Sequence, residues 1–152
     1  MTIRFARPEE MTLLQDMRRA MTLEIDGEDL DIDVRGWRDR FTSFVAGLIA
    51  DGEAAFFVAE HDGELAGMGC VYKLRNHRSV IYGKPSAYVT SVYVRPKHRR
   101  GGVARAITLA SIEWARSNGC VVIRLRASEM GRLVYRSLGF TPTDEMELRL
   151  TT

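Results

Sequence analysis

The sequence contains few of the residues that build metal sites and disulfide frameworks. Among its 152 residues are only two cysteines and three histidines. Cys70 and Cys120 form neither a CxxC pair nor a Cys/His cluster, the spacings that structural zinc sites use. We therefore expect no metal site, and we interpret both cysteines as reduced thiols in buried strands.

Long hydrophobic runs are also missing. No apolar stretch approaches the ~20 residues that a membrane-spanning helix needs, and the N-terminal residues "MTIRFARPEEM" lack the apolar core of a signal peptide. We expect no membrane association and a cytoplasmic location. With 45% hydrophobic and 28% charged residues, the composition is that of a globular protein. The length favours a single domain over residues 1–152.

The charges are divided unevenly along the chain. The net charge is only +2, but residues 1–64 carry −8 and residues 65–152 carry +10. Such an asymmetry suggests an anionic partner for the second half and a cationic one near the first. Opposite charges that pair across the fold would explain the same counts, and both interpretations stay open.

Hydrophobic periodicity predicts a mixed α/β domain around one sheet, in the order β-α-α-β-β-β-α-β-α-β. Helices are expected from Pro8, around Trp37, after Gly102 and over residues 129–138. The acidic residues 24–33 and the polar residues 76–86 are expected to be loops, and Asp-Gly at 62–63 predicts a hairpin. The predicted strands cover residues 2–7, 53–60, 64–75, 87–94, 120–127 and 145–150.

The stretch "RPKHRRGGVARAI", residues 95–107, places four cationic side chains and two glycines before a helix. A helix N-terminus offers unpaired N–H groups, and glycine leaves them open to a phosphate. Gly-Gly alone would equally fit a plain tight turn. The stretch is not a nucleoside-triphosphate loop, because GxxxxGK[ST] is absent.

The surrounding sequence is more specific. "YVTSVYVRPKHRRGGVARAI" resembles the acetyl-coenzyme A binding signature of the GCN5-related N-acetyltransferases, whose core is [RQ]-x-x-G-x-[GA]. Residues 99–104 match that core in register. "RLRASEMGRLVYRSLGF", residues 124–140, supplies the family's later Y-x-x-L-G-F motif. The element order also matches, so the resemblance covers nearly the whole chain.

The resemblance implies acetyl-coenzyme A as co-substrate. Its pyrophosphate would lie on Arg99, Arg100, Gly101, Gly102, Val103 and Ala104. Its pantetheine arm would run beside a splayed central strand, at the backbone of Val92, Tyr93 and Val94. Ser128 stands where the family often has asparagine, and has a shorter reach toward the cofactor; Gly131 stands where it often has alanine.

The resemblance also implies catalytic and acceptor residues. Tyr135 occupies the position of the family's general acid and would lie against the cofactor; the alternative is that it only packs beside Leu133 and Leu138. A backbone N–H near Val92 would stabilise the oxyanion. The general base is not assigned: the acidic residues of the loop after the first helix could relay the proton of the amine through water, and Tyr88 and Tyr93 are further candidates. The acceptor site would be shaped by the acidic residues Glu24, Asp26, Glu28 and Asp29; the alternative is that each is a solvated loop charge.

The expected function is transfer of an acetyl group from the thioester to a primary amine by direct attack. The acceptor stays open among a small amine, an aminoglycoside-like drug, an amino acid and a protein amine. A non-catalytic acyl-coenzyme A sensor is the alternative. A nucleic-acid partner is not expected, because no recognition motif accompanies the basic residues. A homodimer is one open arrangement, since dimers are common in the family.

Overall fold

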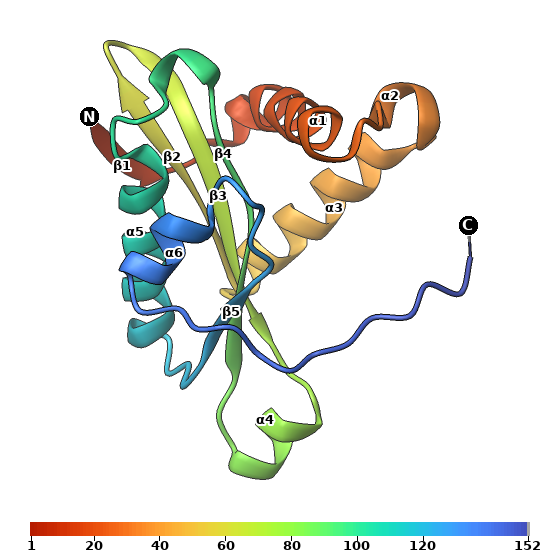
Figure 1. Cartoon of the computed structure of the whole chain (residues 1–152), viewed down its shortest axis with the longest axis vertical. Coiled ribbons are helices and arrows are strands. Elements are labelled where there is room, and N and C mark those ends of the chain that lie inside the picture. Colours follow the sequence, from red (N-terminus) through yellow and green to blue (C-terminus); the bar gives the residue numbers. More distant parts are fainter. Residues whose placement is uncertain (152) are drawn as a thin grey trace.

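The computed structural model describes residues 1–151 and contains a five-stranded sheet with helices on both faces (Figure 1). The spatial order of the strands is β1-β2-β3-β4-β5. All neighbours are antiparallel except β4 and β5, which run parallel. The strands are β1 (Thr2–Phe5), β2 (Ala54–His61), β3 (Glu64–Leu74), β4 (Ser86–Val94) and β5 (Ile123–Leu125).

The helices form two layers. One face of the sheet carries α1 (Met11–Asp26), the short α2 (Leu30–Asp33) and α3 (Trp37–Ala50); the other carries α5 (Val103–Ser117) and α6 (Arg132–Ser137). The short α4 (His77–Tyr82) lies beyond the end of the β3–β4 ribbon, and the 3₁₀ turns η1 (Pro8–Glu10) and η2 (Pro96–His98) precede α1 and α5. The mixed α/β prediction is confirmed.

Each helical layer has its own core. Ile107 and Val103 of α5 pack with small residues of β2, β3 and β4 on one face. Leu14 and Met17 of α1 pack with Phe56 on the other face. Successive side chains of β2 and β3 point to opposite faces of the sheet, so each strand contributes to both cores. These strands are therefore buried on both sides.

The predicted hairpin forms at Asp62 and Gly63. His61 pairs with Glu64, and the two turn residues have φ values of 51° and 78°. A two-residue loop with positive φ at both positions matches the right-handed twist of the strands. The hairpin fixes the pairing register of β2 with β3, and β4 pairs with the other edge of β3.

The feature that positions the site is the divergence of β4 from β5. Their pairing covers only three residues of each strand and ends at Val89 and Leu125. β4 then continues to Val94, with β3 on its other side. The splayed central strands expected from the resemblance are therefore present.

Four local predictions are wrong. The acidic residues 24–33 are largely helical, because α1 continues to Asp26 and α2 follows it. The polar residues 76–86 contain α4, which starts at the side-chain cap of Asn76. The strand predicted over 120–127 is reduced to β5.

The strand predicted over residues 145–150 does not form: this segment pairs with no strand among residues 1–151. A strand needs a neighbouring edge, and the segment leads away from the sheet (Figure 1).

Candidate functional site

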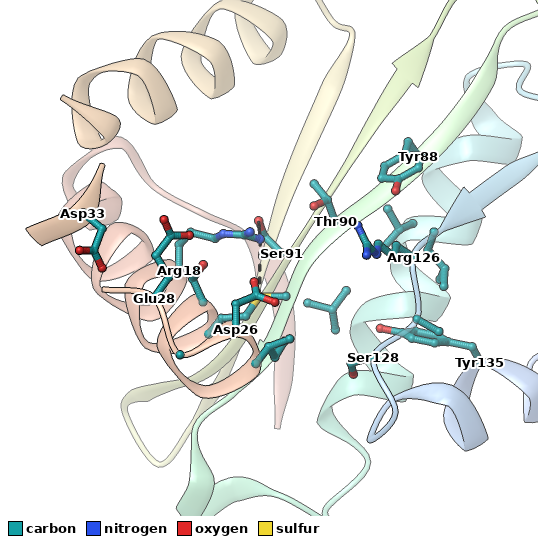
Figure 2. A pocket seen from close by; sticks show the side chains of 18 of the residues that line it. Arg18, Asp26, Glu28, Asp33, Tyr88, Thr90, Ser91, Arg126, Ser128 and Tyr135 are labelled. Carbon is teal, nitrogen blue, oxygen red and sulfur yellow. Dashed lines mark hydrogen bonds between the residues drawn. The ribbon is translucent and has the colours of Figure 1, made fainter. Parts of the chain in front are cut away.

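A cavity of about 830 Å³ opens where β4 and β5 separate. Figure 2 shows side chains from α1, β4, the end of β5 and α6 converging on it. Its polar lining side chains are Arg18, Thr22, Asp26, Glu28, Asp33, Tyr88, Thr90, Ser91, Arg126, Ser128, Tyr135 and Arg149. The divergence of the strands thus exposes backbone and side chains that a regular sheet would bury.

The central strand is distorted beside the cavity. Ser91 has a φ of 57°, and the β3–β4 register shifts between Met68 and Cys70. Arg18 of α1 donates to the Ser91 hydroxyl at 3.1 Å. A bulge of this kind re-aims the backbone groups that follow it.

The bulge turns the N–H of Val94 toward the open side. The next residue, Arg95, donates its N–H to Ala66 of β3 at 2.8 Å. Because backbone groups alternate in direction along a strand, the N–H groups of Val94 and Val92 point away from β3, toward the gap left by β5.

Val92 and Tyr93 contribute differently to the site. Val92 lines the cavity, while its side chain packs against the core under α5. Tyr93 is buried in the core under α1, and by the same alternation its backbone groups face β3 and not the gap, so the structure gives no support to the expected contact of Tyr93 with the pantetheine arm. Tyr88 lines the cavity, whereas Tyr93 does not, and of these two candidates only Tyr88 can reach a bound acceptor.

The loop before α5 has the geometry that an anion requires. Gly102 is the N-cap of α5 with a φ of 78°, and no side chain within residues 1–151 caps the helix start. A Cβ added at Gly102 would meet nothing within 4 Å. The first-turn N–H groups of Val103 and Ala104 are therefore open to an external acceptor, which fits a phosphate.

Two of the cations in this stretch are already paired. Arg99 donates from both terminal nitrogens to Glu24 at 2.7 Å, and its Nε donates to the carbonyl of Val94 at 2.9 Å. Lys97 pairs with Glu64. Arg100, with a φ of 64°, makes no salt bridge within residues 1–151. The charge asymmetry of the sequence is thus partly an intramolecular pairing.

Tyr135 of α6 points into the cavity (Figure 2). Its side chain is buried, and this burial raises the pKa of the phenol above its ordinary value of 10. Its ring packs edge-on against Phe140, with centroids 5.8 Å apart. Tyr135 therefore packs against Phe140 and also presents its hydroxyl to the cavity.

Ser128 and Gly131 shape the approach to Tyr135. The Ser128 hydroxyl accepts the N–H of Gly131 at 3.1 Å and lines the cavity. A Cβ on Gly131 would lie 2.8 Å from Cε2 of Tyr135. Glycine at this position therefore allows the ring to lie close to the start of α6.

The four predicted acidic residues separate into two pairs. Asp26 and Glu28 line the cavity and form no salt bridge with any of residues 1–151. Glu24 is held by Arg99, and Asp29 is held by Arg19 at 2.7 Å while it caps α2. The structure therefore places Asp26 and Glu28 together at the cavity, whereas Glu24 and Asp29 are bound by arginines.

Sequence reasoning named Asp26 but missed Arg18 and Thr22, which share its face of α1. Arg18, Thr22 and Asp26 recur every four residues and all line the cavity. Burial lowers the pKa of the Arg18 guanidinium. Thr22 is buried, and its hydroxyl has no hydrogen-bond partner within the described chain. The i, i+4 spacing of polar residues on a helix that packs on the sheet was the available signal.

Two other expectations concern metals and membranes. Within residues 1–151, no group of three or more His, Cys, Asp or Glu side chains is placed to hold a metal ion. None of the helices formed by these residues is long and apolar enough to cross a membrane. Both cysteines are free, although Cys120 lies before β5 and is only half-buried.

Comparison with known proteins identifies the architecture. A profile of the Acetyltransferase (GNAT) family matches residues 12–140. Two relatives described as aminoglycoside N(6′)-acetyltransferase type 1 are each 30% identical. The Klebsiella aerogenes relative matches over 55% of this chain and 54% of its own, and the Stenotrophomonas maltophilia relative over 64% and 67%. The chain thus spans about half the length of the first relative.

Solved structures share the fold over almost the whole chain. A predicted acetyltransferase with acetyl-CoA from Clostridium acetobutylicum superposes with a TM-score of 0.82 at 24% identity, covering 98% of this chain and 96% of that one. A GCN5-related N-acetyltransferase from Ralstonia eutropha gives 0.83 at 24% identity, covering 98% and 97%. The family profile, the splayed sheet and the glycine loop agree, and the chain belongs to the GNAT acetyltransferase family.

Proposed function

We propose that residues 1–152 act as one acetyl-coenzyme A dependent N-acetyltransferase domain. The observation that carries the proposal is the cavity at the β4–β5 divergence, which joins the backbone of β4 to the hydroxyl of the otherwise buried Tyr135. A thioester placed along β4 would meet an oxyanion donor and a proton donor within one enclosure.

The cofactor would be held mainly by backbone groups. The open start of α5 and the φ of Gly102 suit the pyrophosphate, and the N–H groups of Val92 and Val94 suit the amides of the pantetheine arm. Arg100 supplies a free cation to this loop. Arg99 contributes charge only if its pair with Glu24 opens, so its present role is to join the loop to the end of α1.

The reaction follows from these positions. The lone pair of a neutral amine attacks the thioester carbonyl carbon, and a strand N–H stabilises the oxyanion that forms. When the oxyanion collapses, the C–S bond breaks, and Tyr135 gives its proton to the departing thiolate. The amine loses one proton to solvent, and the phenolate regains one from solvent. The phenol is protonated at neutral pH, and burial raises its pKa further, which keeps the proton in place but makes Tyr135 a weaker acid.

For the acceptor, we propose a small cationic amine that carries several hydroxyl groups. Asp26, Glu28 and Asp33 offer carboxylates to ammonium groups, while Arg18 and the unsatisfied Thr22 hydroxyl can bond to oxygen. The relatives described as aminoglycoside acetyltransferases support the same chemistry. A cytoplasmic location stays a prediction.

The experiment follows release of free thiol from acetyl-coenzyme A in the presence of different amines. An aminoglycoside, a free amino acid and a peptide with a free N-terminus form the panel. We expect turnover to be fastest with the aminoglycoside. Binding of acetyl-coenzyme A without turnover for any amine would instead favour the sensor function.

A further inference from the structure

Arg18 reaches from α1 across one side of the cavity to the central strand (Figure 2). Its Nη1 donates to the Ser91 hydroxyl at 3.1 Å and to the sulfur of Met21 at 3.6 Å. Its Nε and Nη2 donate to no group of residues 1–151, and none of their carboxylates forms a salt bridge with it. A guanidinium carries five N–H donors, so most of its hydrogen-bonding capacity is left for a ligand.

The surroundings of Arg18 make an unpaired charge costly. Burial lowers the pKa of the guanidinium, yet an arginine stays charged in a protein. A charge that is partly removed from water is unfavourable unless an anion or a polar group compensates for it. One turn further along the same face, Thr22 is only 5% exposed, and its hydroxyl has no partner within the described chain. Polar groups left unpaired beside a cavity are explained by a ligand that completes their hydrogen bonds.

The position of Arg18 selects one oxygen of that ligand. Its partner Ser91 directly precedes Val92, whose N–H faces the gap left by β5 and is the proposed oxyanion donor. The guanidinium therefore lies beside the place where the thioester would react. It would repel the ammonium form of an acceptor, whereas the thioester carbonyl oxygen becomes negative as the amine attacks. Among the reacting atoms, that oxygen is the one that a fixed cation stabilises.

We propose that Arg18 is a second oxyanion donor, whose guanidinium hydrogen-bonds to the thioester carbonyl oxygen together with the N–H of Val92. The role rests on the proposed acetyl transfer. As the amine attacks the carbonyl carbon, the π electron pair moves to the oxygen, and Arg18 stabilises this charge while it keeps its own proton. When the C–S bond breaks, the pair returns to form the carbonyl of the amide. The interaction is strongest in the transition state, because the oxygen is more negative there than in the bound thioester.

The first experiment locates Arg18 without any turnover. S-carboxymethyl-coenzyme A carries a carboxylate where the acetyl carbonyl would lie, and S-ethyl-coenzyme A is an uncharged counterpart of similar size. By calorimetry, the unaltered protein should bind the carboxymethyl compound about tenfold more tightly, because a hydrogen bond to a charged group is added. Arg18→Met should abolish this preference. Unchanged affinity of the variant for S-ethyl-coenzyme A shows that it is folded.

The second experiment measures kcat and the acceptor KM with the amine that is turned over fastest. Arg18→Met should lower kcat about a hundredfold, as loss of one oxyanion donor does, and leave the acceptor KM nearly unchanged. Arg18→Lys keeps the charge but loses the planar fork, so its kcat should be intermediate. Arg116→Met, on the exposed side of α5, removes the same charge far from the cavity and should match the unaltered protein in both experiments.

Three results would overturn the proposal. The first is a preference for the carboxylate that survives in Arg18→Met. The second is a raised acceptor KM at unchanged kcat, because Arg18 would then bind the acceptor. The third is an equal loss of the preference in Ser91→Ala, which removes only the hydroxyl and would show that Arg18 acts through the strand. An unaltered protein that turns over no amine would overturn the transferase function itself, whereas the binding preference would still place Arg18 at the acyl oxygen.

Discussion

At the scale of single residues, Tyr135 joins two environments. One side of its ring packs on Phe140, and its hydroxyl faces the cavity. A thiol has an ordinary pKa of about 8.5 and a phenol of about 10, so proton transfer to the thiolate is slightly unfavourable at neutral pH. Burial raises the phenol pKa further. The contribution of Tyr135 should therefore lie at the low end of the range for general acids.

Tyr135→Phe keeps the ring and should lower kcat by about a hundredfold or less, with cofactor affinity near normal. Because burial raises the phenol pKa above its ordinary value of about 10, ionisation of Tyr135 should not lower kcat below about pH 10. Steady-state kinetics at saturating acceptor measure this, with Tyr82→Phe on the exposed α4 as control. A kcat within about twofold of normal would leave Tyr135 a packing residue.

The acidic residues give a second prediction at this scale. Replacing Asp26 and Glu28 by amides should raise the acceptor KM several-fold, because both carboxylates line the cavity without a salt-bridge partner in residues 1–151. The effect should shrink with added salt, which screens exposed charges over about 8 Å at physiological ionic strength.

Glu24→Gln and Asp29→Asn are the matched control. They remove the same charge, but from residues that Arg99 and Arg19 hold outside the cavity. If the second pair of changes raised the acceptor KM as much as the first, general charge attraction would explain the result and the cavity assignment would fail.

At the scale of elements, the loop before α5 depends on backbone shape. Gly102 must adopt a positive φ, and the space beside it is open. A residue with a branched Cβ is strained at this positive φ, and its side chain would occupy the approach to the helix N-terminus.

Gly102→Val should weaken acetyl-coenzyme A binding well over tenfold, as measured by calorimetry. Gly83→Val is the control, because Gly83 has a φ of 69° in equally open space at the end of α4. Both changes strain the backbone, but only the first blocks the proposed phosphate site. Equal losses of affinity in the two variants would point to general destabilisation.

At the scale of the whole molecule, Arg4 connects the start of the chain to the sheet. It donates to Glu60 of β2 and to both carboxylate oxygens of Glu10, each at 2.9 Å. The Arg4 hydrogen bonds lower the pKa of Glu10 to about 2. Because the folded-state pKa lies below the unfolded one, the stabilisation is present above about pH 4.3 and is lost as pH falls toward 2.

Glu10→Gln should therefore lower the free energy of unfolding at neutral pH by about 1–2 kcal/mol, with little effect near pH 2. Urea titrations at both pH values measure this. Glu9→Gln is the control, since Glu9 is exposed and forms no salt bridge with residues 1–151. An equal loss at both pH values would show that the charge of Glu10 is not responsible.

The sequence by itself determined the features that local chemistry specifies. The Asp62-Gly63 hairpin follows from positive φ, the helix after Gly102 from helical periodicity, and the glycine loop before it from the resemblance of residues 99–104 to the family signature. Tyr135 was located by a motif of adjacent residues. In each case the physical requirement lies within a few neighbouring positions, so a linear pattern can express it.

Only the tertiary structure decided what depends on distant partners. The sequence left open whether the cations of residues 95–100 pair within the fold, and Arg99 pairs with Glu24, which is 75 positions away. Asp26 faces the cavity while Asp29 does not, because α1 ends between them. Residues 144–150 have the alternation of a strand yet remain unpaired, since a strand forms only where another edge accepts its backbone hydrogen bonds.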